Sequence, residues 1–205
     1  MCLDLYQKIN SYENQKYFES FILYSVATVL AGVKPSCTIN FKRNSKDDYA
    51  NWNKYGETIL ASIKLEYIKL RDDGKSMIIL VYKKSLIRKQ LINHKINAFL
   101  VKLGYSNELD VDGYLNTLKK RYEKYNCPHE LGIFLGIPIE DVIDFMECNE
   151  DKCIACGYWK VYNNYSSAMR TFKIYDKVKD ITAKQIINEV DLGLIANNLR
   201  NIFVK

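Results

Sequence analysis

The spacing of apolar and polar residues in the first part of the chain predicts a helix, a strand and a second helix. A long apolar stretch predicts a buried helix over residues 17–31, which ends at Gly32 and Pro35 because proline cannot continue a helix. Apolar and polar residues then alternate over residues 37–41, as in a half-buried strand. Ser45 resembles an N-cap, and the apolar positions that follow it predict the second helix.

The clearest local pattern is a β-hairpin in the next segment. Apolar residues alternate over 63–67, an Asp-Asp-Gly turn stands at 72–74, and a continuous apolar run at 77–82 predicts a central strand. A basic helix is predicted over residues 86–103 because its apolar residues fall on one face, with Ser85 as its N-cap.

The second half of the chain is mainly helical in pattern. Asp110 can cap one helix, and two short helices begin near Pro128 and Pro138, each proline at the first helical position. A strand is predicted at 158–162, and residues 166–203 are helical in pattern. Strands and helices are thus interspersed, which predicts an α/β (α+β) protein. We expect a mixed sheet of about four strands, including one β-hairpin, covered by helices.

Length and composition favour one domain in a reducing compartment. With 205 residues, 48% of them hydrophobic, the chain can bury a sizeable core, and we expect a single domain over residues 1–205. The first residues are polar and mixed in charge, unlike a secretory leader, and the apolar stretch at 21–33 is too short to cross a bilayer. We therefore expect a cytoplasmic protein with no membrane partner, in which the six cysteines stay free, bind metal or do redox work.

The net charge of +6 is unevenly distributed along the chain. Residues 74–107 include no acidic residue, whereas residues 139–151 include no basic one. The basic helix, residues 84–102, is therefore a candidate surface for an acidic protein partner. Its candidate contact residues are Lys84, Arg88 and Lys95. A basic run is more often a solvated face, and the lack of an aromatic-rich RNA-binding pattern disfavours nucleic acid.

Two nucleotide-related motifs are incomplete. The Gly-Lys-Ser at 74–76 ends like a phosphate-binding loop, but Lys69 stands where that loop requires its first glycine. Residues 131–146 have a helix-turn-helix pattern, yet the second helix is acidic and DNA phosphates would repel it. The sequence therefore argues against both functions in these segments.

The densest candidate chemistry is a group of cysteines near residue 150. Cys148, Cys153 and Cys156 have the C-x4-C-x2-C spacing with which plant-type ferredoxins hold an iron–sulfur cluster. Cys127 or His129 could supply a fourth ligand, and a zinc site could be built from the same set. The cofactors considered are therefore zinc, an iron–sulfur cluster or haem. Free cysteines at a helix end and a strand start are the alternative.

The Cys-Pro-His-Glu sequence at 127–130 predicts a specific helix start. With Pro128 at the first helical position, Cys127 is the N-cap and Glu130 can reach back to the N–H of the cap. A thiol at a helix N-terminus has a lowered pKa and becomes reactive or ligating. The alternative is capping alone, with His129 solvated or packed, and no third group for a Cys–His nucleophile can be identified.

The aromatic segment at 158–162 is a candidate ligand surface. Tyr158 and Trp159 could stack on a planar ligand, although alternating aromatic residues on a strand more often pack in the core. A pocket that joins this segment to Cys127 or His129 would favour a small-molecule enzyme. No catalytic residue is identified from the sequence, and whether the protein is an enzyme stays open.

Two longer segments resemble a known family. They are Cys-Pro-His-Glu-Leu-Gly-Ile-Phe-Leu-Gly-Ile-Pro-Ile-Glu-Asp-Val at 127–142 and Cys-Gly-Tyr-Trp-Lys-Val-Tyr at 156–162. They resemble the clostridial family known as domain of unknown function 3793, and the resemblance covers about residues 20–180. It implies an anaerobic bacterial cytosol and one compact domain, with a core at 16–180 and a C-terminal helical extension at 181–205. It implies no activity.

Two functions from different classes follow from these features. The first is a cytosolic accessory protein, metal-linked or thiol redox, that uses the Cys/His stretch 127–156. The second is a non-catalytic binding module that docks an acidic protein or nucleic acid through the basic helix 84–102.

Overall fold

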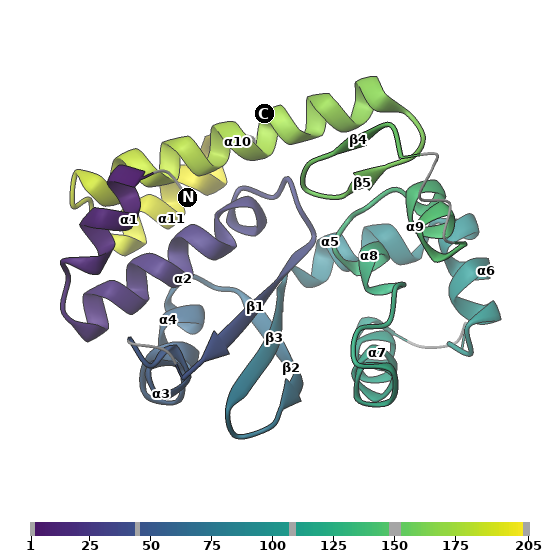
Figure 1. The fold of residues 1–205 in the computed structure, drawn as a ribbon, viewed down its shortest axis with the longest axis horizontal. Coiled ribbons are helices and arrows are strands. Elements are labelled where there is room, and N and C mark those ends of the chain that lie inside the picture. The colour runs from purple at the N-terminus through teal and green to yellow at the C-terminus, as the bar shows by residue number, and fades with distance from the viewer. Residues whose placement is uncertain (1–2, 44–45, 107–109, 148–152, 203–205) are drawn as a thin grey trace.

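The computed structural model describes residues 3–43, 46–106, 110–147 and 153–202, which form an α+β fold (Figure 1). The helices are α1 (Leu3–Asn10), α2 (Asn14–Leu30), α3 (Asp48–Asn51), the π-helix η1 (Trp52–Gly56), α4 (Glu57–Ser62), α5 (Lys84–Leu91), α6 (His94–Lys102), α7 (Val111–Tyr125), α8 (Leu131–Phe134), α9 (Ile139–Met146), α10 (Tyr165–Ile187) and α11 (Leu192–Ile202). The strands are β1 (Ser36–Lys42), β2 (Glu66–Asp72), β3 (Ser76–Tyr82), β4 (Ala155–Cys156) and β5 (Lys160–Val161).

Strand β3 lies at the centre of an antiparallel sheet in the order β1-β3-β2. Side chains alternate between the two faces of a strand, so β3 supplies residues to both sides of the sheet. Met77, Ile79 and Val81 lie in one hydrophobic core. Ile78, Leu80 and Tyr82 lie in a second core on the other face.

The first core lies between the sheet and helices α1, α2, α10 and α11. In Figure 1, α1, α2 and α11 lie at the left, and α10 runs along the top. Helix α2 is buried along most of its length and ends at Leu30. Gly32 follows with a φ of +71°, the left-handed conformation common after helices. Helix α10 passes residues 180 and 181 without a break. Ile186 and Leu199 from the C-terminal helices lie in the same core as α2, so these helices are part of the packed structure.

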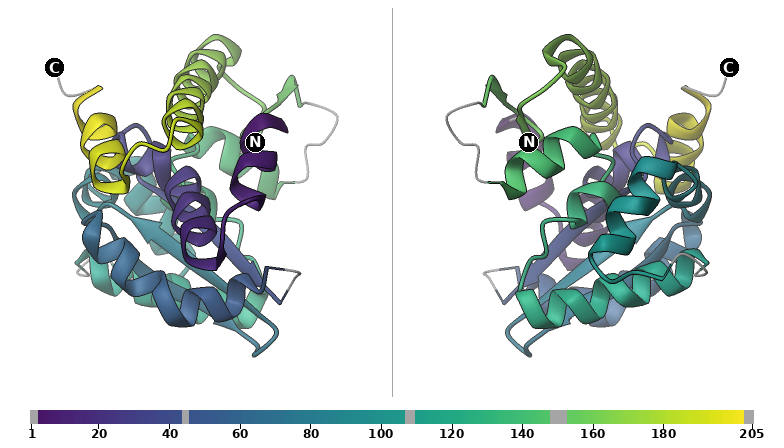
Figure 2. Two further views of the ribbon diagram at one scale, coloured as in Figure 1. Left: turned by 90° about the vertical axis from the view of Figure 1, so that its left-hand side faces the viewer. Right: turned by 90° about the vertical axis from the view of Figure 1, so that its right-hand side faces the viewer.

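Helices α5 to α9 cover the other face of the sheet and form the second core, at the right of Figure 1. Asp110 caps α7 as predicted, because its side chain accepts a hydrogen bond from Gly113 N at 2.9 Å. The β4–β5 hairpin lies beside α9 and against α10, as Figure 2 shows from the side of α9. The hairpin packs through a small third cluster made of Val161, Ala168 and Phe172.

The structure confirms the α+β class, the first strand and the β2–β3 hairpin. It corrects the sheet: among the described residues there is a three-stranded antiparallel sheet and a separate two-stranded one, instead of one mixed sheet of about four strands. The aromatic strand predicted at 158–162 is shorter, because only Lys160 and Val161 pair with β4.

The predicted basic helix is also corrected, because it divides into α5 and α6. The Asn93 side chain accepts hydrogen bonds from Lys95 N at 3.0 Å and Ile96 N at 3.4 Å, and so starts a new helix. The break leaves Ile92 76% exposed, although the helical pattern places it on the buried face. Lys83, not Ser85, is the residue at the N-cap of α5.

The predicted second helix is interrupted by the π-helix η1. Ser45, its predicted N-cap, lies outside the described residues, and Asp47 caps α3 by accepting a hydrogen bond from Ala50 N. A Cβ at Gly56 would lie 2.2 Å from Cε3 of Trp52, so the packing of the indole against the backbone at the other end of η1 requires glycine.

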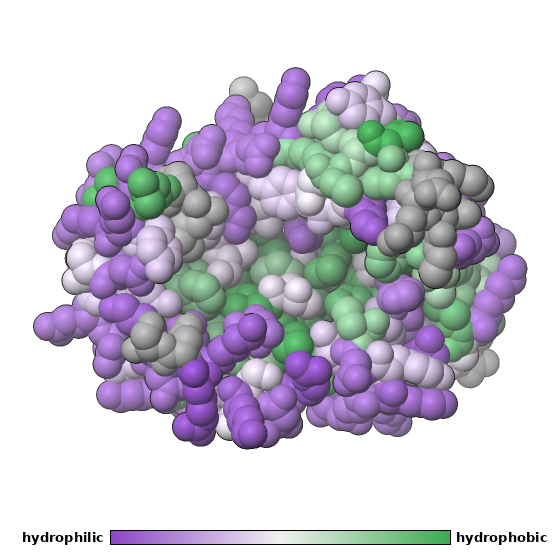
Figure 3. All heavy atoms as spheres, in the orientation of Figure 1, coloured by the Kyte–Doolittle hydropathy of each residue, from purple (hydrophilic) through white to green (hydrophobic). Residues whose placement is uncertain are grey.

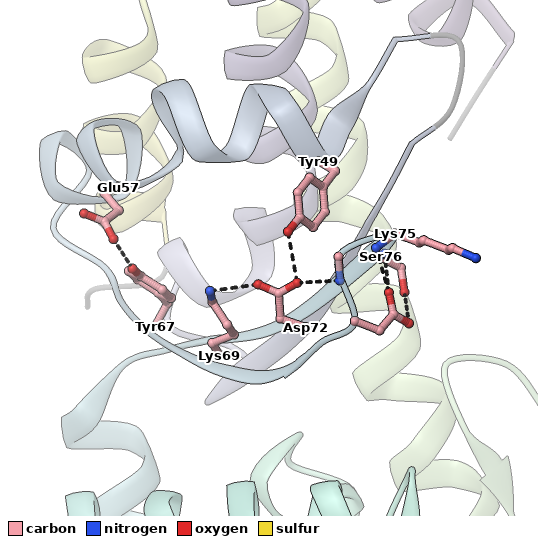
Figure 4. A network of polar contacts seen from close by, with 9 residues as sticks. Tyr49, Glu57, Tyr67, Lys69, Asp72, Lys75 and Ser76 are labelled. Carbon is pink, nitrogen blue, oxygen red and sulfur yellow. Dashed lines mark hydrogen bonds and ion pairs between the residues drawn. The ribbon is translucent and has the colours of Figure 1, made fainter.

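The Gly-Lys-Ser turn at 74–76 is a hairpin turn held by two carboxylates (Figure 4). Asp72 accepts hydrogen bonds from Gly74 N, Tyr49 Oη and Lys69 Nζ. Asp73 accepts from the N–H groups of Lys75 and Ser76, and these backbone bonds hold the pKa of Asp73 below its ordinary value. The N–H groups that a phosphate loop would offer to its ligand are therefore already bonded.

Within the described ranges, no helix has the length and apolar character needed to cross a bilayer.

We predict that Ile79→Ala lowers the free energy of unfolding by about 2–5 kcal/mol, because it leaves a cavity at a fully buried position of the central strand. The matched control Ile154→Ala removes a side chain that is 54% exposed and should change stability by less than about 0.5 kcal/mol. Urea denaturation followed by circular dichroism measures both. Equal effects of the two variants would contradict the central position of β3.

Candidate functional site

The turn after α7 places Cys127 on the surface, outside any helix. Asn126 has a φ of +61°, and Cys127 N donates a hydrogen bond to Tyr125 O at 2.7 Å. Helix α8 begins only at Leu131, so the predicted N-cap role of Cys127 is wrong. The Cys127 side chain lies near Tyr122 instead. Two causes raise the pKa of Tyr122 to about 12: chiefly the burial of its hydroxyl group, and then the nearby Cys127 thiol.

Glu130 does not reach back to Cys127, because it is buried and paired with the preceding helix. Its carboxylate is only 1% exposed and accepts hydrogen bonds from Arg121 Nε and from Tyr105 Oη. Arg121 also donates to Leu103 O at 2.8 Å, and its pKa is raised chiefly by the bond to Glu130. A buried carboxylate requires such a cation, since removal from water otherwise costs several kcal/mol. Glu130 therefore fixes the Cys-Pro-His turn to α7.

Asp141 is the residue that connects α9 to the aromatic segment. Its Oδ1 accepts hydrogen bonds from Tyr162 N at 3.0 Å, Asn163 N at 2.9 Å and Asn163 Nδ2 at 3.1 Å. Its Oδ2 accepts from Trp159 Nε1 at 2.8 Å. The carboxylate is 3% exposed, and these four donors replace the water that it loses on burial.

The sequence prediction treated Asp141 only as part of an acidic run. One signal was available, because Asp141 and Phe145 stand four residues apart on α9 and share one helical row, and Ile137 stands four residues before Asp141 on the turn that leads into the helix. A lone carboxylate in an otherwise apolar row indicates a buried acceptor. Its donors lie about 20 residues further on, and no local pattern identifies them.

The β4–β5 hairpin brings two of the predicted cysteines together. Cys153 Sγ and Cys156 Sγ are 3.7 Å apart, with Cys153 half-buried and Cys156 exposed. The hydrogen bond with Cys153 raises the pKa of Cys156, against an opposing effect of Lys160, which pairs with Cys156 in the hairpin. A Cβ at Gly157 would lie 2.3 Å from the Phe172 ring, so glycine lets the hairpin lie directly on α10.

A pocket of about 260 Å³ lies between helices α8 and α9 and the hairpin. Its apolar lining consists of Pro128, Leu131, Leu135, Ile137, Val142 and Phe145. The remaining contacts come from Cys127, His129, Gly132, Asp141, Tyr158, Trp159 and Lys160. Four predicted site residues, Cys127, His129, Tyr158 and Trp159, thus line one cavity. Figure 3 shows apolar surface gathered over the β4–β5 hairpin and across the hollowed centre of the same face.

Aromatic contacts hold the pocket side chains in place. The His129 ring lies edge-on to Phe145 with 5.0 Å between centroids, and Lys160 Nζ lies 5.8 Å from the Phe145 centroid. Trp159 packs edge-on against Phe172 at 4.5 Å, and Tyr158 Oη donates to Asp176 at 2.8 Å. Burial, followed by this bond, raises the pKa of Tyr158.

The predicted metal ligands do not form one cluster within the described ranges. No three His, Cys, Asp or Glu side chains there lie close enough to hold a metal ion. Cys127 and His129 line the pocket, Cys153 and Cys156 form the hairpin pair, and Cys148 lies outside the described residues. A zinc or iron–sulfur site that includes Cys148 stays a prediction.

Two cations of the predicted basic surface face carboxylates. Lys84 Nζ lies 2.5 Å from Asp112 Oδ2, and Lys95 Nζ lies 3.6 Å from Glu140 Oε1. Arg88 lines a separate surface pocket formed by α5, α6 and the start of α7. The Lys95–Glu140 pair brings the basic segment against the acidic helix α9, so the two oppositely charged segments meet at this point.

The comparisons with known proteins identify one family. The model of a family described as "Protein of unknown function (DUF3793)" matches residues 22–195, which confirms the resemblance seen in the sequence. The searches of curated proteins and of solved structures give no match.

We predict that Asp141→Asn lowers the free energy of unfolding by about 1–3 kcal/mol, because an amide group then faces buried N–H donors. It should also shift the indole N–H resonance of Trp159. The control Glu140→Gln, which loses one exposed ion pair, should cost less than about 1 kcal/mol. Urea denaturation and NMR measure these changes, and an unchanged Trp159 signal would contradict the role of Asp141.

Proposed function

Because the chain belongs to the DUF3793 family, whose description assigns no function, we propose one from the geometry: thiol–disulfide exchange at Cys153 and Cys156. The observation that carries this proposal is the 3.7 Å separation of the two sulfur atoms. A disulfide requires about 2.05 Å between sulfurs, so a small movement within the hairpin closes the bond. The C-x-x-C spacing is common in redox dithiols.

Accessibility and proton affinity distinguish the two thiols. Cys156 is exposed, and its pKa is raised mainly by the hydrogen bond with Cys153, so it keeps its proton to a higher pH than a free thiol. In the dithiol form Cys153 Sγ donates to Ala155 O at 3.3 Å, and either sulfur can donate in the contact between the two cysteines. Once Cys153 has lost its proton, the protonated Cys156 can donate to its Sγ, which supports Cys153 as the attacking sulfur. Cys156 then acts as the resolving thiol.

The exchange conserves electrons and protons. The Cys153 thiolate attacks one sulfur of a substrate disulfide, forms a mixed disulfide and releases the first substrate thiol. The Cys156 thiolate then attacks Cys153 Sγ, forms the Cys153–Cys156 disulfide and releases the second substrate thiol. Two electrons pass from the dithiol to the substrate. Each cysteine loses its proton before it attacks, and the two released substrate thiolates take up two protons from solvent and leave as thiols.

A reducing compartment is required for repeated turnover. We infer a cytoplasmic protein, because thiol systems there return an exposed disulfide to the dithiol form. The substrate disulfide must reach Cys153 from solvent, and this residue is partly exposed, beside the exposed Cys156.

We predict one two-electron transition when the protein is equilibrated in thiol–disulfide redox buffers under anaerobic conditions. The midpoint should lie at about −180 to −270 mV, the range of exchanging protein dithiols. Peptide mass spectrometry should locate the disulfide at Cys153–Cys156. Cys156→Ser should abolish the transition, and the control Cys127→Ser should retain it.

Three outcomes would overturn this function. One is a disulfide whose midpoint lies below about −300 mV, so that it is reduced only at still more negative potentials, as in structural disulfides. Another is a disulfide between other cysteines. The third is stoichiometric zinc bound to the pair after purification, because a tetrahedral ion with Zn–S bonds of about 2.3 Å would occupy both sulfurs.

We also predict that Cys153→Ala lowers the pKa of Cys156 toward its ordinary value of 9.0. The substitution removes the partner that stabilises the protonated thiol, while Lys160 still favours the thiolate. The midpoint of the pH profile for iodoacetamide labelling of Cys156 should therefore move to lower pH, with faster labelling at pH values below the midpoint. Cys127→Ala is the control and should leave the profile unchanged; an unchanged profile in Cys153→Ala would refute the sulfur–sulfur hydrogen bond.

A further inference from the structure

A groove of about 820 Å³ lies at the end of the molecule away from the β4–β5 hairpin, where α1, α2, α10 and α11 come together at the left of Figure 1. One side of it comes from residues 12–23 and the other from residues 186–195, and Tyr55 completes the lining. Tyr12 Oη donates a hydrogen bond to Ile186 O at 3.3 Å, which connects the two sides. We call this feature the acidic groove.

The floor of the acidic groove is apolar. Leu23, Ile186 and Ile195 are each at most 4% exposed and belong to the first core. Val190 and Leu192 are half-buried, line the groove and pack against the same core. A ligand with aliphatic side chains can therefore bury apolar surface here, which favours binding.

The charges of the groove are mainly negative, although the chain as a whole carries a net charge of +6. Four carboxylates and one ammonium group line it. Glu189 is neutralised, because Lys8 Nζ lies 2.7 Å and Lys16 Nζ 3.1 Å from its oxygens. The other three carboxylates form no ion pair with a cation in the part of the chain that the structure describes, and they are Glu13, Glu19 and Asp191.

Neutral donors bind two of these carboxylates and leave their charge in place. Gln15 Nε2 donates to Glu19 Oε1 at 2.9 Å, and Leu194 N donates to Asp191 Oδ1 at 3.0 Å. Glu13 stands at the N-cap of α2, but its side chain makes no cap hydrogen bond. Charged carboxylates beside an apolar floor are complementary to a ligand that is both cationic and apolar.

We propose that the acidic groove docks a basic amphipathic segment of a partner protein. Lys or Arg side chains of the segment face Glu13, Glu19 and Asp191, and its aliphatic side chains cover the floor. A linear polyamine could meet the carboxylates, but it carries a charge every few carbon atoms and has no branched apolar side chain for the floor. The groove is also about three times the volume of the pocket between α8, α9 and the hairpin, which gives room for several side chains.

The test is isothermal titration calorimetry of the full chain with a peptide of the proposed chemistry, acetyl-Lys-Leu-Leu-Lys-Lys-Leu-Leu-Lys-amide, in dilute salt. We expect saturable binding of one peptide for each chain. One control peptide replaces each Leu by Ser and keeps the charge, and a second replaces each Lys by Glu and keeps the apolar residues. Each control should bind at least about tenfold more weakly, because each lacks one half of the complementarity.

A triple variant locates the binding in the groove. Glu13→Gln with Glu19→Gln and Asp191→Asn removes three charges, while the amide oxygens can still accept from Gln15 and Leu194. The loss of three exposed ion pairs should weaken the peptide about tenfold.

The matched control changes the net charge by the same amount at exposed positions outside the groove. It combines Glu66→Gln, Glu123→Gln and Asp180→Asn. Distant exposed charges are screened by salt, so the affinity should change by less than about twofold.

The peptide series on the unmodified protein keeps the test independent of how the variants fold. The proposal is overturned if the Lys-Leu peptide does not saturate, or if the Lys-Ser peptide or spermine binds as tightly, which would indicate a site for any polycation. Equal loss of affinity in the two triple variants would also overturn it. So would self-association of the free chain in sedimentation that the groove variant abolishes, because a second copy would then be the occupant.

The acidic groove is independent of the thiol chemistry, because neither Cys153 nor Cys156 lines it. Each outcome leaves the redox titration of the pair unaffected, so the two proposals fail separately.

Discussion

Strand β3 is the constraint on which the rest of the structure depends, because its alternate residues enter the two hydrophobic cores on opposite faces of the sheet. Ile79 faces the helices of the first core, and Leu80, the next residue, faces those of the second. A shift of register by one residue would exchange every side chain between the faces. The pairing of β3 with both neighbours therefore fixes where the two helical layers stand, and with them the position of the pocket.

Buried carboxylates then determine the local geometry of the candidate site. Glu130 binds the turn to α7, and Asp141 binds α9 to the segment after β5. Each is satisfied by donors from another element, so each carboxylate orders two segments at once. The pocket lies between these two connections, which explains how side chains on short helices and a two-residue strand pair are held in fixed positions.

Local patterns in the sequence were sufficient for much of the fold. The apolar run of β3, the Asp-Asp-Gly turn and the Asp110 cap each act over a few residues, and each was identified correctly. The break at Asn93 was missed because the apolar spacing continues through it. The site was harder to predict: the Cys153–Cys156 pair is local, whereas the burial of Glu130 and Asp141 depends on donors distant in sequence.

The β4–β5 hairpin makes few of the contacts that stabilise the main fold. Its ladder has two residue pairs, and it rests on α10 through a small cluster that is distinct from both cores. Segments with few buried contacts open locally at lower free energy than the global unfolding reaction. We therefore expect the amide hydrogens of the hairpin to exchange faster than those of β3, and the thiol pair to change its covalent state while the sheet and its helices stay folded.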